Sequence, residues 1–312
     1  MNSTFKQYLQ YACKAVVGVV FCVSAILKLV SIESFEIYVF SFQFFGLPLS
    51  YIAARIIICL ELIIGAALLL NIYKRQVYIA ALSLLTAFTF FLLYVHFFRG
   101  NDENCHCFGE LLQLNPLYSI VKNAALVALV LVSRNAAPFG FAREKITGIV
   151  LSAVVFASIF IISPPDNWLT FDTAEYNETA LNEAFANNVL DENDFRNGNT
   201  IVCFYGAGCR YCDLANKKME VILQNYPGIV PDIVGVFWGT NENYTTFIEN
   251  SKVPFSKTIL ISPAPFLKIT NGIMPVLLVI KDGKVVNTLK YRSIDENVFL
   301  QVYGSGEMRV VE

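Results

Sequence analysis

Two close pairs of cysteines are the residues of this sequence most able to carry out chemistry. Cys105 and Cys107 flank His106, and Cys209 and Cys212 enclose a dipeptide. The other four cysteines are scattered in apolar runs: Cys13, Cys22, Cys59 and Cys203. Closely spaced cysteines are typical of redox or metal sites, whereas a disulfide-stapled secreted domain has more cysteines at more even spacing. The sequence therefore predicts thiol chemistry at two places.

The second pair lies where a strand is predicted to pass into a helix. Residues 199–206 alternate in polarity and are rich in β-formers, Ala207-Gly208 breaks the run, and an amphipathic pattern follows. Both cysteines then fall in the first helical turn, where the helix dipole and free N–H groups lower the pKa of an exposed thiol. We expect Cys209 to be the nucleophile and Cys212 the resolving thiol.

The surrounding pattern resembles thioredoxin. A strand is predicted over 230–238, a helix over 241–251, a hairpin with an Asp-Gly turn within 272–291, and a closing helix over 294–303. Met274-Pro275 resembles the cis-proline motif of thioredoxin-like proteins, and this resemblance implies that it lies beside the disulfide and holds partner peptides.

Two positions depart from that resemblance. Gly208 stands where many relatives have Trp, and Arg210-Tyr211 is not a common dipeptide between the cysteines. Because the residues between the cysteines tune the reduction potential, the resemblance does not predict the reduction potential of this pair. Cys203, inside the strand, is interpreted as a core residue, and Cys209 with Cys212 has no further metal ligands nearby.

The first pair forms the motif Cys105-His106-Cys107 with turn-forming residues after it. A disulfide over this spacing needs Cα atoms within about 6.8 Å, and so small a ring is strained and readily reduced. Pro116 is well placed to open the next helix. Two alternatives remain. The motif offers soft ligands for copper or zinc, although His96 is the only other histidine, and the disulfide could be merely structural.

The composition indicates that a membrane domain positions this pair. Hydrophobic residues make up 55% of the 312 residues and charged residues only 15%, which is too apolar for a soluble chain of this length. The expected spans lie near 14–32, 50–71, 77–98, 117–134 and 146–163. Residues 33–48 are too interrupted for a span and are interpreted as interfacial. The sequence has no basic patch with interleaved aromatic residues, so nucleic acid is not an expected partner.

Basic residues predict the orientation of the spans. If the spans alternate, one side receives all the basic residues of the N-terminus and two loops: Lys6, Lys14, Lys74, Arg75, Arg134, Arg143 and Lys145. That side is expected to be cytoplasmic. The loop with Cys105 and Cys107, and the acidic C-terminal half, are then expected outside, where disulfides persist.

Several polar residues fall within the predicted spans. Five are expected within about two helical turns of the outer surface: Lys28, Arg55, His96, Arg99 and Lys122. Such a ring favours thiolate at the cysteine pair or cradles an anionic or quinone headgroup; alternatively, the cations snorkel to the interface. Glu61 lies deeper and is expected to have a partner or to carry protons. Cys22 and Cys59 are interpreted as core residues in preference to the alternative of a buried relay pair.

The CHCFG loop ahead of the fourth span, together with Lys28 in SAILKL, resembles the MauE/DoxX family of redox-associated membrane proteins over residues 1–135. This resemblance implies a redox role for Cys105 and Cys107, in concert with a thioredoxin-like partner, in disulfide handling outside the cytoplasm. Members of that family take part in maturing methylamine dehydrogenase. Here the thioredoxin-like partner is fused to the membrane protein.

The expected architecture is an α-helical transmembrane bundle followed by an α/β thioredoxin-like domain. The predicted parts are 1–135, a four-helix MauE/DoxX-like domain; 136–168, a fifth span and linker; and 169–312, the thioredoxin-like domain. We expect a thiol–disulfide oxidoreductase of the cell (inner) membrane, with a cytoplasmic N-terminus, acting on extracytoplasmic protein thiols. A membrane quinone is one electron carrier. The alternatives are copper handling by the Cys-His-Cys loop and a passive membrane anchor.

Overall fold

The protein divides into two compact units. We describe a computed structural model of the chain, covering residues 3–72, 74–100, 105, 107–110, 114–134, 144–166, 174–196 and 198–304. One unit comprises Met1–Val39 and Leu49–Pro165, and the other comprises Phe40–Pro48 and Asp166–Glu312. The predicted domain boundaries at 135/136 and 168/169 lie outside the described residues. Each unit is described separately.

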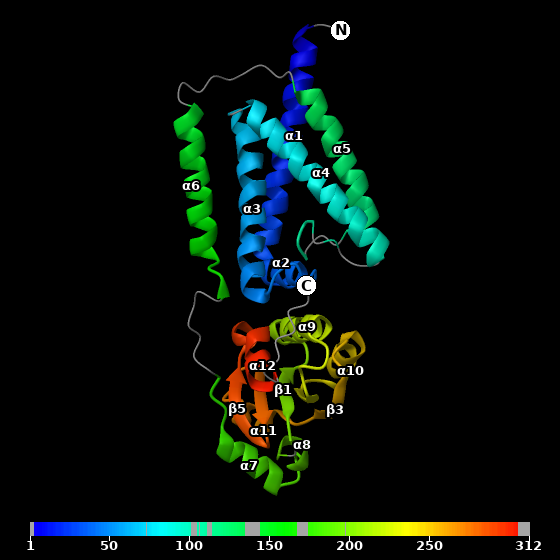
Figure 1. Ribbon diagram of the computed structural model, residues 1–312, viewed down its shortest axis with the longest axis vertical. Helices are drawn as coiled ribbons and strands as arrows, with labels where there is room; N and C mark the ends of the chain where they lie inside the picture. Colours follow the sequence, from blue (N-terminus) through cyan, green and yellow to red (C-terminus); the bar gives the residue numbers. More distant parts are fainter. Residues whose placement is uncertain are drawn as a thin grey trace. The chain divides into compact units, whose positions relative to one another are not determined.

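The first unit is a bundle of long apolar helices (Figure 1). Its helices are α1 (Ser3–Val30), α2 (Ile32–Phe40), α3 (Leu47–Leu70), α4 (Lys74–Phe98), α5 (Pro116–Ser133) and α6 (Glu144–Ile162). All but α2 are long and apolar enough to cross a membrane. Each of the five contains or nearly contains a span predicted from the sequence. The short α2 lies in the segment interpreted as interfacial.

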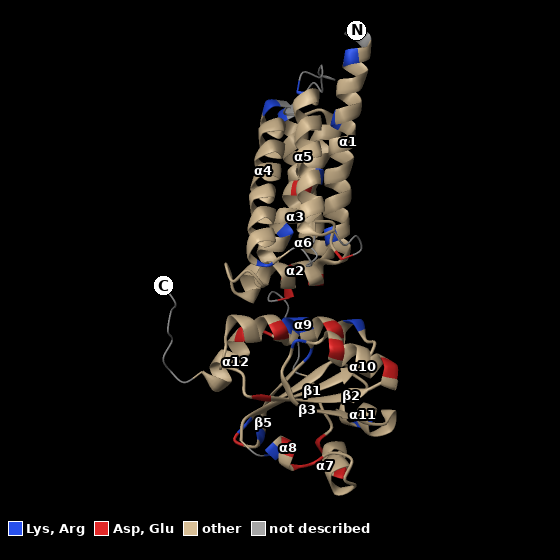
Figure 2. Ribbon diagram, turned by 90° about the vertical axis from the view of Figure 1, so that its right-hand side faces the viewer, with Lys and Arg blue, Asp and Glu red and all other residues tan. Residues whose placement is uncertain are grey.

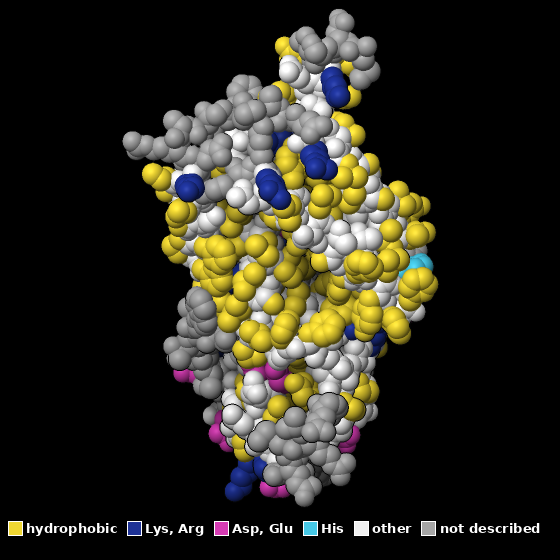
Figure 3. Space-filling view, turned by 45° about the horizontal axis from the view of Figure 1, so that its top comes forward, with side chains coloured by type: hydrophobic (Ala, Val, Ile, Leu, Met, Phe, Trp, Pro, Cys, Tyr) yellow, Lys and Arg dark blue, Asp and Glu magenta, His cyan; other side chains and the backbone are white. Residues whose placement is uncertain are grey.

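The outer surface of the bundle suits a lipid environment. Many large apolar side chains are exposed along the helices, among them Val23, Phe90 and Ile149, and Figure 3 shows hydrophobic side chains covering this surface. Lys and Arg positions, without acidic ones, mark the end of the bundle where α1 begins (Figure 2). Arg75 and Arg134 line one depression at that end. The alternation of five helices places the loop between α4 and α5 at the opposite end.

Two buried ion pairs hold the bundle together internally. Lys28 of α1 pairs with Glu61 of α3 at 2.6 Å, and both side chains are buried. Arg55 of α3 pairs with Glu36 of α2 and donates to the carbonyl oxygens of Ser163, at 2.6 Å, and Pro164, at 2.9 Å. A charge at this depth needs such a partner because the low dielectric penalises an isolated ion.

The second unit contains a mixed five-stranded sheet within its described residues. The strands are β1 (Thr200–Gly206), β2 (Asp232–Trp238), β3 (Phe255–Leu260), β4 (Val276–Lys281) and β5 (Lys284–Leu289). They are ordered β3-β2-β1-β4-β5. Strand β1 runs parallel to β2, and β2 runs parallel to β3, whereas β4 is antiparallel to both β1 and β5. This arrangement is a thioredoxin-like fold.

Helices cover the sheet because successive side chains of a strand point to opposite faces. Val202, Phe204 and Val236 share one core cluster with α7 (Glu178–Ala186), α8 (Asn193–Arg196) and α11 (Pro263–Ile269). On the alternate positions, Tyr205 and Phe237 contact Phe247. The remaining helices are α9 (Arg210–Asn225), α10 (Asn241–Asn250), η2 (Tyr291–Ser293) and α12 (Glu296–Tyr303).

Candidate functional site

The Cys209/Cys212 pair lies at the junction of β1 and α9, as the sequence predicts. Gly208 adopts a left-handed φ of +89°, which turns the chain after β1. Cys209 is the N-cap residue of α9, with extended backbone, and is half-buried. Cys212 lies in the first turn and is fully buried, and the Gly206 N–H donates to its Sγ at 3.3 Å. Only the first thiol is therefore within reach of a partner.

The two thiols of this pair have opposite acidities. A hydrogen bond from the Cys212 thiol lowers the pKa of Cys209 to about 6, against the opposing effect of burial, and backbone N–H groups of Cys212 and Tyr211 add to it. The same hydrogen bond, together with burial, raises the pKa of Cys212. At pH 7 a thiol with such a pKa is about nine-tenths thiolate. The pair combines a thiolate nucleophile with a thiol that keeps its proton.

The Met274-Pro275 peptide is cis and lies beside this pair. A Cβ placed on Gly206 would lie 2.5 Å from Met274 Sδ and 3.4 Å from the Cβ of Cys209, so Met274 covers the end of β1 next to the nucleophile. Tyr211 of α9 is 41% exposed, and its ring centroid lies 5.4 Å from that of Tyr291 in η2, with the rings tilted by 45°. These groups border the exposed sulfur.

The Cys105/Cys107 loop is fastened to α1 by hydrogen bonds. Ser24 Oγ lies 2.8 Å from the Cys107 carbonyl oxygen, the N–H of Glu110 donates to Ser31 Oγ at 3.0 Å, and Ser34 Oγ donates to the Glu110 carboxylate at 2.7 Å. Ser24 lies in α1, Ser31 at the turn after it and Ser34 in α2. The loop thus has a fixed seat on the helix.

The thiols of this loop are also an unequal pair. A hydrogen bond from Cys107 lowers the pKa of Cys105 to about 6 against the effect of burial, and Ser119 Oγ, 2.9 Å from Cys105 Sγ, and the charge of Lys122 act in the same direction. The hydrogen bond to Cys105 and burial raise the pKa of Cys107. Both side chains are only 1% exposed. A partner therefore gains access to Cys105 only when the loop opens.

Comparison with known protein families gives an assignment for the helical unit. Residues 6–134 match the family described as "Methylamine utilisation protein MauE". The N-terminal bundle is similar to this family over those residues. Helices α1 to α5 and the cysteine loop fall within the match, whereas α6 and the sheet unit lie beyond it.

One curated relative and one solved structure are similar to parts of this chain. The chain is 32% identical over 176 residues to "Protein TlpB" of Flavobacterium psychrophilum. The match takes in 53% of this chain, and the chain spans about half, 47%, of the length of that relative. A solved structure, "Solution structure of a thiol:disulfide interchange protein from Bacteroides sp.", is 18% identical, with a TM-score of 0.31, over 37% of this chain and 80% of that one. The thioredoxin-like fold rests on the strand order above.

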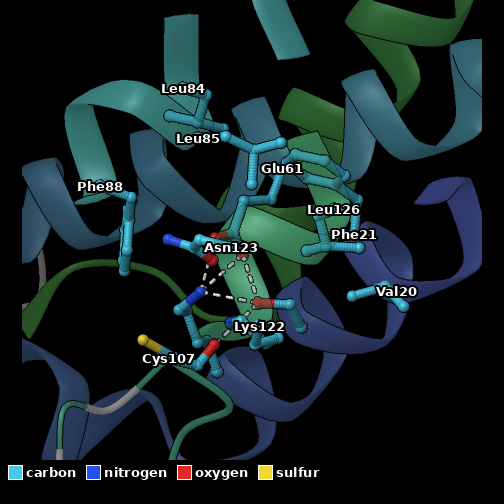
Figure 4. Close-up of a pocket in the computed structure, with 12 residues that line it drawn as sticks. Val20, Phe21, Glu61, Leu84, Leu85, Phe88, Cys107, Lys122, Asn123 and Leu126 are labelled. Carbon is cyan, nitrogen blue, oxygen red and sulfur yellow. Dashed lines mark hydrogen bonds and ion pairs between the residues drawn. The ribbon is translucent and has the colours of Figure 1, made fainter. Parts of the chain in front are cut away.

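A small polar cavity lies in the helical unit beside Cys107 (Figure 4). Its volume is about 30 Å³. The polar side of its lining comprises Ser24, Lys28, Glu61, Cys107, Lys122 and Asn123, and the apolar side Val20, Phe21, Leu84, Leu85, Phe88 and Leu126. The dashed lines in the figure join Lys28, Ser24, Glu61 and the Cys107 carbonyl. A volume near 30 Å³ with several polar partners has room for water.

The predicted ring of cations is brought to the cysteine loop only in part. Lys28 and Lys122 line the cavity, and Lys122 Nζ lies 4.4 Å from the Phe108 ring centroid. Lys28 and Arg55 are buried with carboxylate partners, so the snorkelling alternative is wrong for both. Arg55 forms its ion pair with Glu36 and its hydrogen bonds with the end of α6. His96 packs 5.4 Å from Phe97, and Arg99 is half-buried at the end of α4.

The sequence missed the polar partners of these cations. Glu61 was expected to have a partner or to carry protons, and Lys28 is that partner, 33 positions away. Neither Ser24 nor Glu36 stood out, because a serine or a glutamate in an amphipathic stretch carries no local signal. Cys59 is buried in one core cluster with Ala25 and Ile58, as expected of a core residue, whereas Cys22 is half-buried and lies against Gly65.

The metal alternative is only partly addressed by the structure. Among the residues that the structure describes, no three His, Cys, Asp or Glu side chains form a group able to hold a metal ion. His106, the middle residue of the Cys-His-Cys motif, lies outside the described residues. Copper binding by this loop therefore stays a prediction.

Proposed function

We propose that this multi-pass membrane protein is a thiol–disulfide oxidoreductase with two redox-active pairs, Cys209/Cys212 and Cys105/Cys107. The observation that carries the proposal is the asymmetry of the first pair, a half-buried Cys209 with its pKa lowered to about 6 beside a fully buried Cys212 with its pKa raised. Exchange requires one accessible thiolate and one thiol held back to resolve the mixed disulfide.

The exchange reaction follows from these roles. The Cys209 thiolate attacks a disulfide, forms a mixed disulfide and releases the partner's other sulfur as a thiolate, which takes up a proton. Cys212 then loses its proton and attacks Cys209, closing the Cys209–Cys212 disulfide and releasing the second partner sulfur. Two electrons pass from the dithiol to the partner. The Cys105/Cys107 dithiol restores the reduced state by the same two steps, and each reaction runs in either direction.

The partners of the sheet unit are protein thiols and disulfides outside the cytoplasm. Met274 and Pro275 beside Cys209 supply an apolar edge for a peptide. The sidedness rests on the basic end of the bundle, which the positive-inside rule assigns to the cytoplasm. A membrane-impermeant thiol reagent added to intact cells should label Cys209, and protection of Cys209 until the membrane is opened would reverse the orientation.

The terminal carrier that we propose is a membrane quinone, which accepts two electrons and dissolves in the bilayer around the bundle. The cavity beside Cys107, at about 30 Å³, is too small for its ring, since a cavity that holds benzene measures about 150 Å³. The ring would bind from the lipid side. Reduced protein in liposomes should bleach the absorbance of an added short-chain quinone, and a C105S/C107S variant should not.

A trapping experiment tests the proposal directly. In C212S, a mixed disulfide at Cys209 cannot resolve, so its partner accumulates and is identified by mass spectrometry in native membranes. We expect two kinds of product, a bond from Cys209 to Cys105 or Cys107 and bonds to extracytoplasmic proteins. C203S is the matched control, because Cys203 is a buried thiol of β1 with its pKa raised by burial.

The alternatives predict other products. If Cys209 forms bonds only to other proteins and Cys105/Cys107 stay untouched, the helices are an anchor or a metal site. If C212S traps nothing above C203S, the sheet unit is not an exchange domain and the proposal is wrong.

A further inference from the structure

The buried pair Lys28–Glu61 has a relation to the cysteine loop that an ordinary structural ion pair lacks. Lys28 Nζ lies 2.6 and 2.7 Å from the two oxygens of Glu61. Both side chains line the cavity that Cys107 also lines. The second buried pair of the bundle, Arg55–Glu36, does not line that cavity. Glu61 and Cys107, whose thiol has a raised pKa, thus line one space that has room for water.

Resolution by Cys107 needs a proton acceptor at this place. The thiol must become a thiolate before it attacks, and its raised pKa keeps it protonated at neutral pH. We propose that Glu61 accepts the proton of Cys107 through water in the cavity. The inference rests on the proposed redox role of Cys105/Cys107 and adds a group that carries the proton.

The groups that surround Glu61 make this transfer feasible. The cavity that Glu61 lines also receives Lys28 from α1, Lys122 from α5 and Cys107 from the loop. Helix α4 contributes the apolar Leu84, Leu85 and Phe88, and α2 presents Phe35 to Lys28. Moving a proton from Cys107 to Glu61 changes no net charge in the site. The negative charge shifts from the carboxylate to the sulfur, where Lys122 still attracts it. The Lys28 ammonium keeps its hydrogen bonds to Ser24 and to the neutral Glu61 carboxyl, which limits the cost of losing its counter-charge.

Ser24 gives the loop a way to respond to the proton on Glu61. Its Oγ lies 3.0 Å from Glu61 Oε2 and 2.8 Å from the Cys107 carbonyl oxygen. A hydroxyl has one proton to donate. While Glu61 is a carboxylate, the two acceptors compete for that proton; once Glu61 is protonated, it donates to Ser24 and Ser24 donates to the carbonyl. Protonation of Glu61 therefore strengthens the bond that seats Cys107.

The complete step balances without any further reagent. In the mixed disulfide, Cys105 Sγ is bonded to the partner sulfur. Cys107 gives its proton to Glu61, its thiolate attacks Cys105 Sγ, the Cys105–Cys107 bond forms and the bond to the partner breaks. The partner sulfur leaves as a thiolate with the electron pair and takes up a proton from water. Glu61 returns its proton when the pair is reduced again.

The test separates the two sulfur steps of the membrane pair. In a C209S/C212S background in liposomes, 2,2′-dithiodipyridine reacts with Cys105 and releases one thiopyridone, and resolution by Cys107 releases a second. The C105S variant of that background measures release by the remaining cysteines. We expect E61Q to slow the second phase at least about tenfold more than the first, since a positioned acid or base typically contributes about 10² to 10⁴.

Two readouts exclude a merely structural role. The second phase of E61Q should accelerate steeply with rising pH, because Cys107 then loses its proton only to hydroxide, whereas the second phase of the parent should depend less on pH. E36Q, which breaks the other buried pair, is the matched control and should leave both phases intact. Where E61Q does not fold, the K28Q/E61Q double variant removes both charges together and tests the same loss.

Each outcome decides between the possibilities. An unchanged second phase in E61Q, or an equal slowing of both phases, or the same slowing in E36Q, overturns the role of Glu61. Failure of the parent to release a second thiopyridone overturns the redox role of Cys105/Cys107 instead, so the two failures are distinguishable.

Discussion

The acidity of Cys209 is set mainly by a single neighbouring atom. The Cys212 thiol is the largest cause of its lowered pKa, ahead of the backbone N–H groups at the start of α9. A helix N-terminus alone would give a smaller effect, since the burial of Cys209 opposes ionisation. The resolving thiol thus also activates the nucleophile while both are reduced.

Removing that donor should make Cys209 a weaker acid. The rate of alkylation by iodoacetamide follows the thiolate fraction, so its midpoint should lie near pH 6 in a C105S/C107S background. In C212A the midpoint should move toward the ordinary thiol value near 8.5, and the rate at pH 7 should fall by about tenfold. C212S keeps a donor and should shift less, and equal shifts in the two variants would contradict this explanation.

At the scale of elements, α1 works as a seat for the cysteine loop. Gly109 lets the loop lie flat on it: its φ is +67°, and a Cβ there would clash with Ser31 Oγ and lie 2.6 Å from the Leu27 carbonyl oxygen. Ser24, Ser31 and Ser34 then hold the segment on either side. The seat keeps both thiols buried, so its strength governs how often the loop opens.

Gly109→Ala should unseat the loop. An L-residue in the left-handed region costs about 1–2 kcal/mol, and the clash with α1 adds to that. We expect alkylation of Cys105 to accelerate because the loop leaves its seat. Gly100→Ala is the matched control, since Gly100 also has a left-handed φ, +92°, but a Cβ there meets nothing within 4 Å. Similar rates in the two variants would show that α1 does not hold the loop.

The elements that the sequence predicted are those with a strong local signal. The five long helices, β1, β2, the β4–β5 hairpin and α9 each carry an apolar run, an alternation or an Asp-Gly turn, and all are confirmed. Strand β3 was missed because FSKTIL is polar on several positions and is defined only by its pairing with β2. Short helices α7, α8 and α11 were missed because a few turns give too little periodicity.

The candidate sites divide in the same way. The thiol pairs and Met274-Pro275 are contiguous in sequence, so their chemistry is readable there. Lys28–Glu61 and Arg55–Glu36 join positions 33 and 19 residues apart on different helices, and only the packing of those helices selects the partner. A single sequence therefore predicts that a cation in a membrane span needs a partner, but it does not identify that partner.

At the scale of the whole molecule, the two cysteine pairs share one chain. Linking two reacting groups turns a bimolecular exchange into an intramolecular one, with an effective concentration up to about millimolar. This matters for Cys105 and Cys107 because their burial makes each opening brief. A tethered partner is present whenever the loop opens, whereas a free partner at micromolar concentration is usually absent.

Cutting the chain between the units should reveal this advantage. A protease site introduced within residues 167–173 allows cleavage after folding, and the Cys209–Cys212 disulfide is then allowed to oxidise the Cys105/Cys107 dithiol. In the intact chain the rate should not depend on protein concentration. After cleavage it should become proportional to concentration and, at micromolar protein, fall by about 10²–10⁴-fold. An unchanged rate would mean that the units hold each other without the linker, and no exchange even in the intact chain would leave the bundle as a passive anchor.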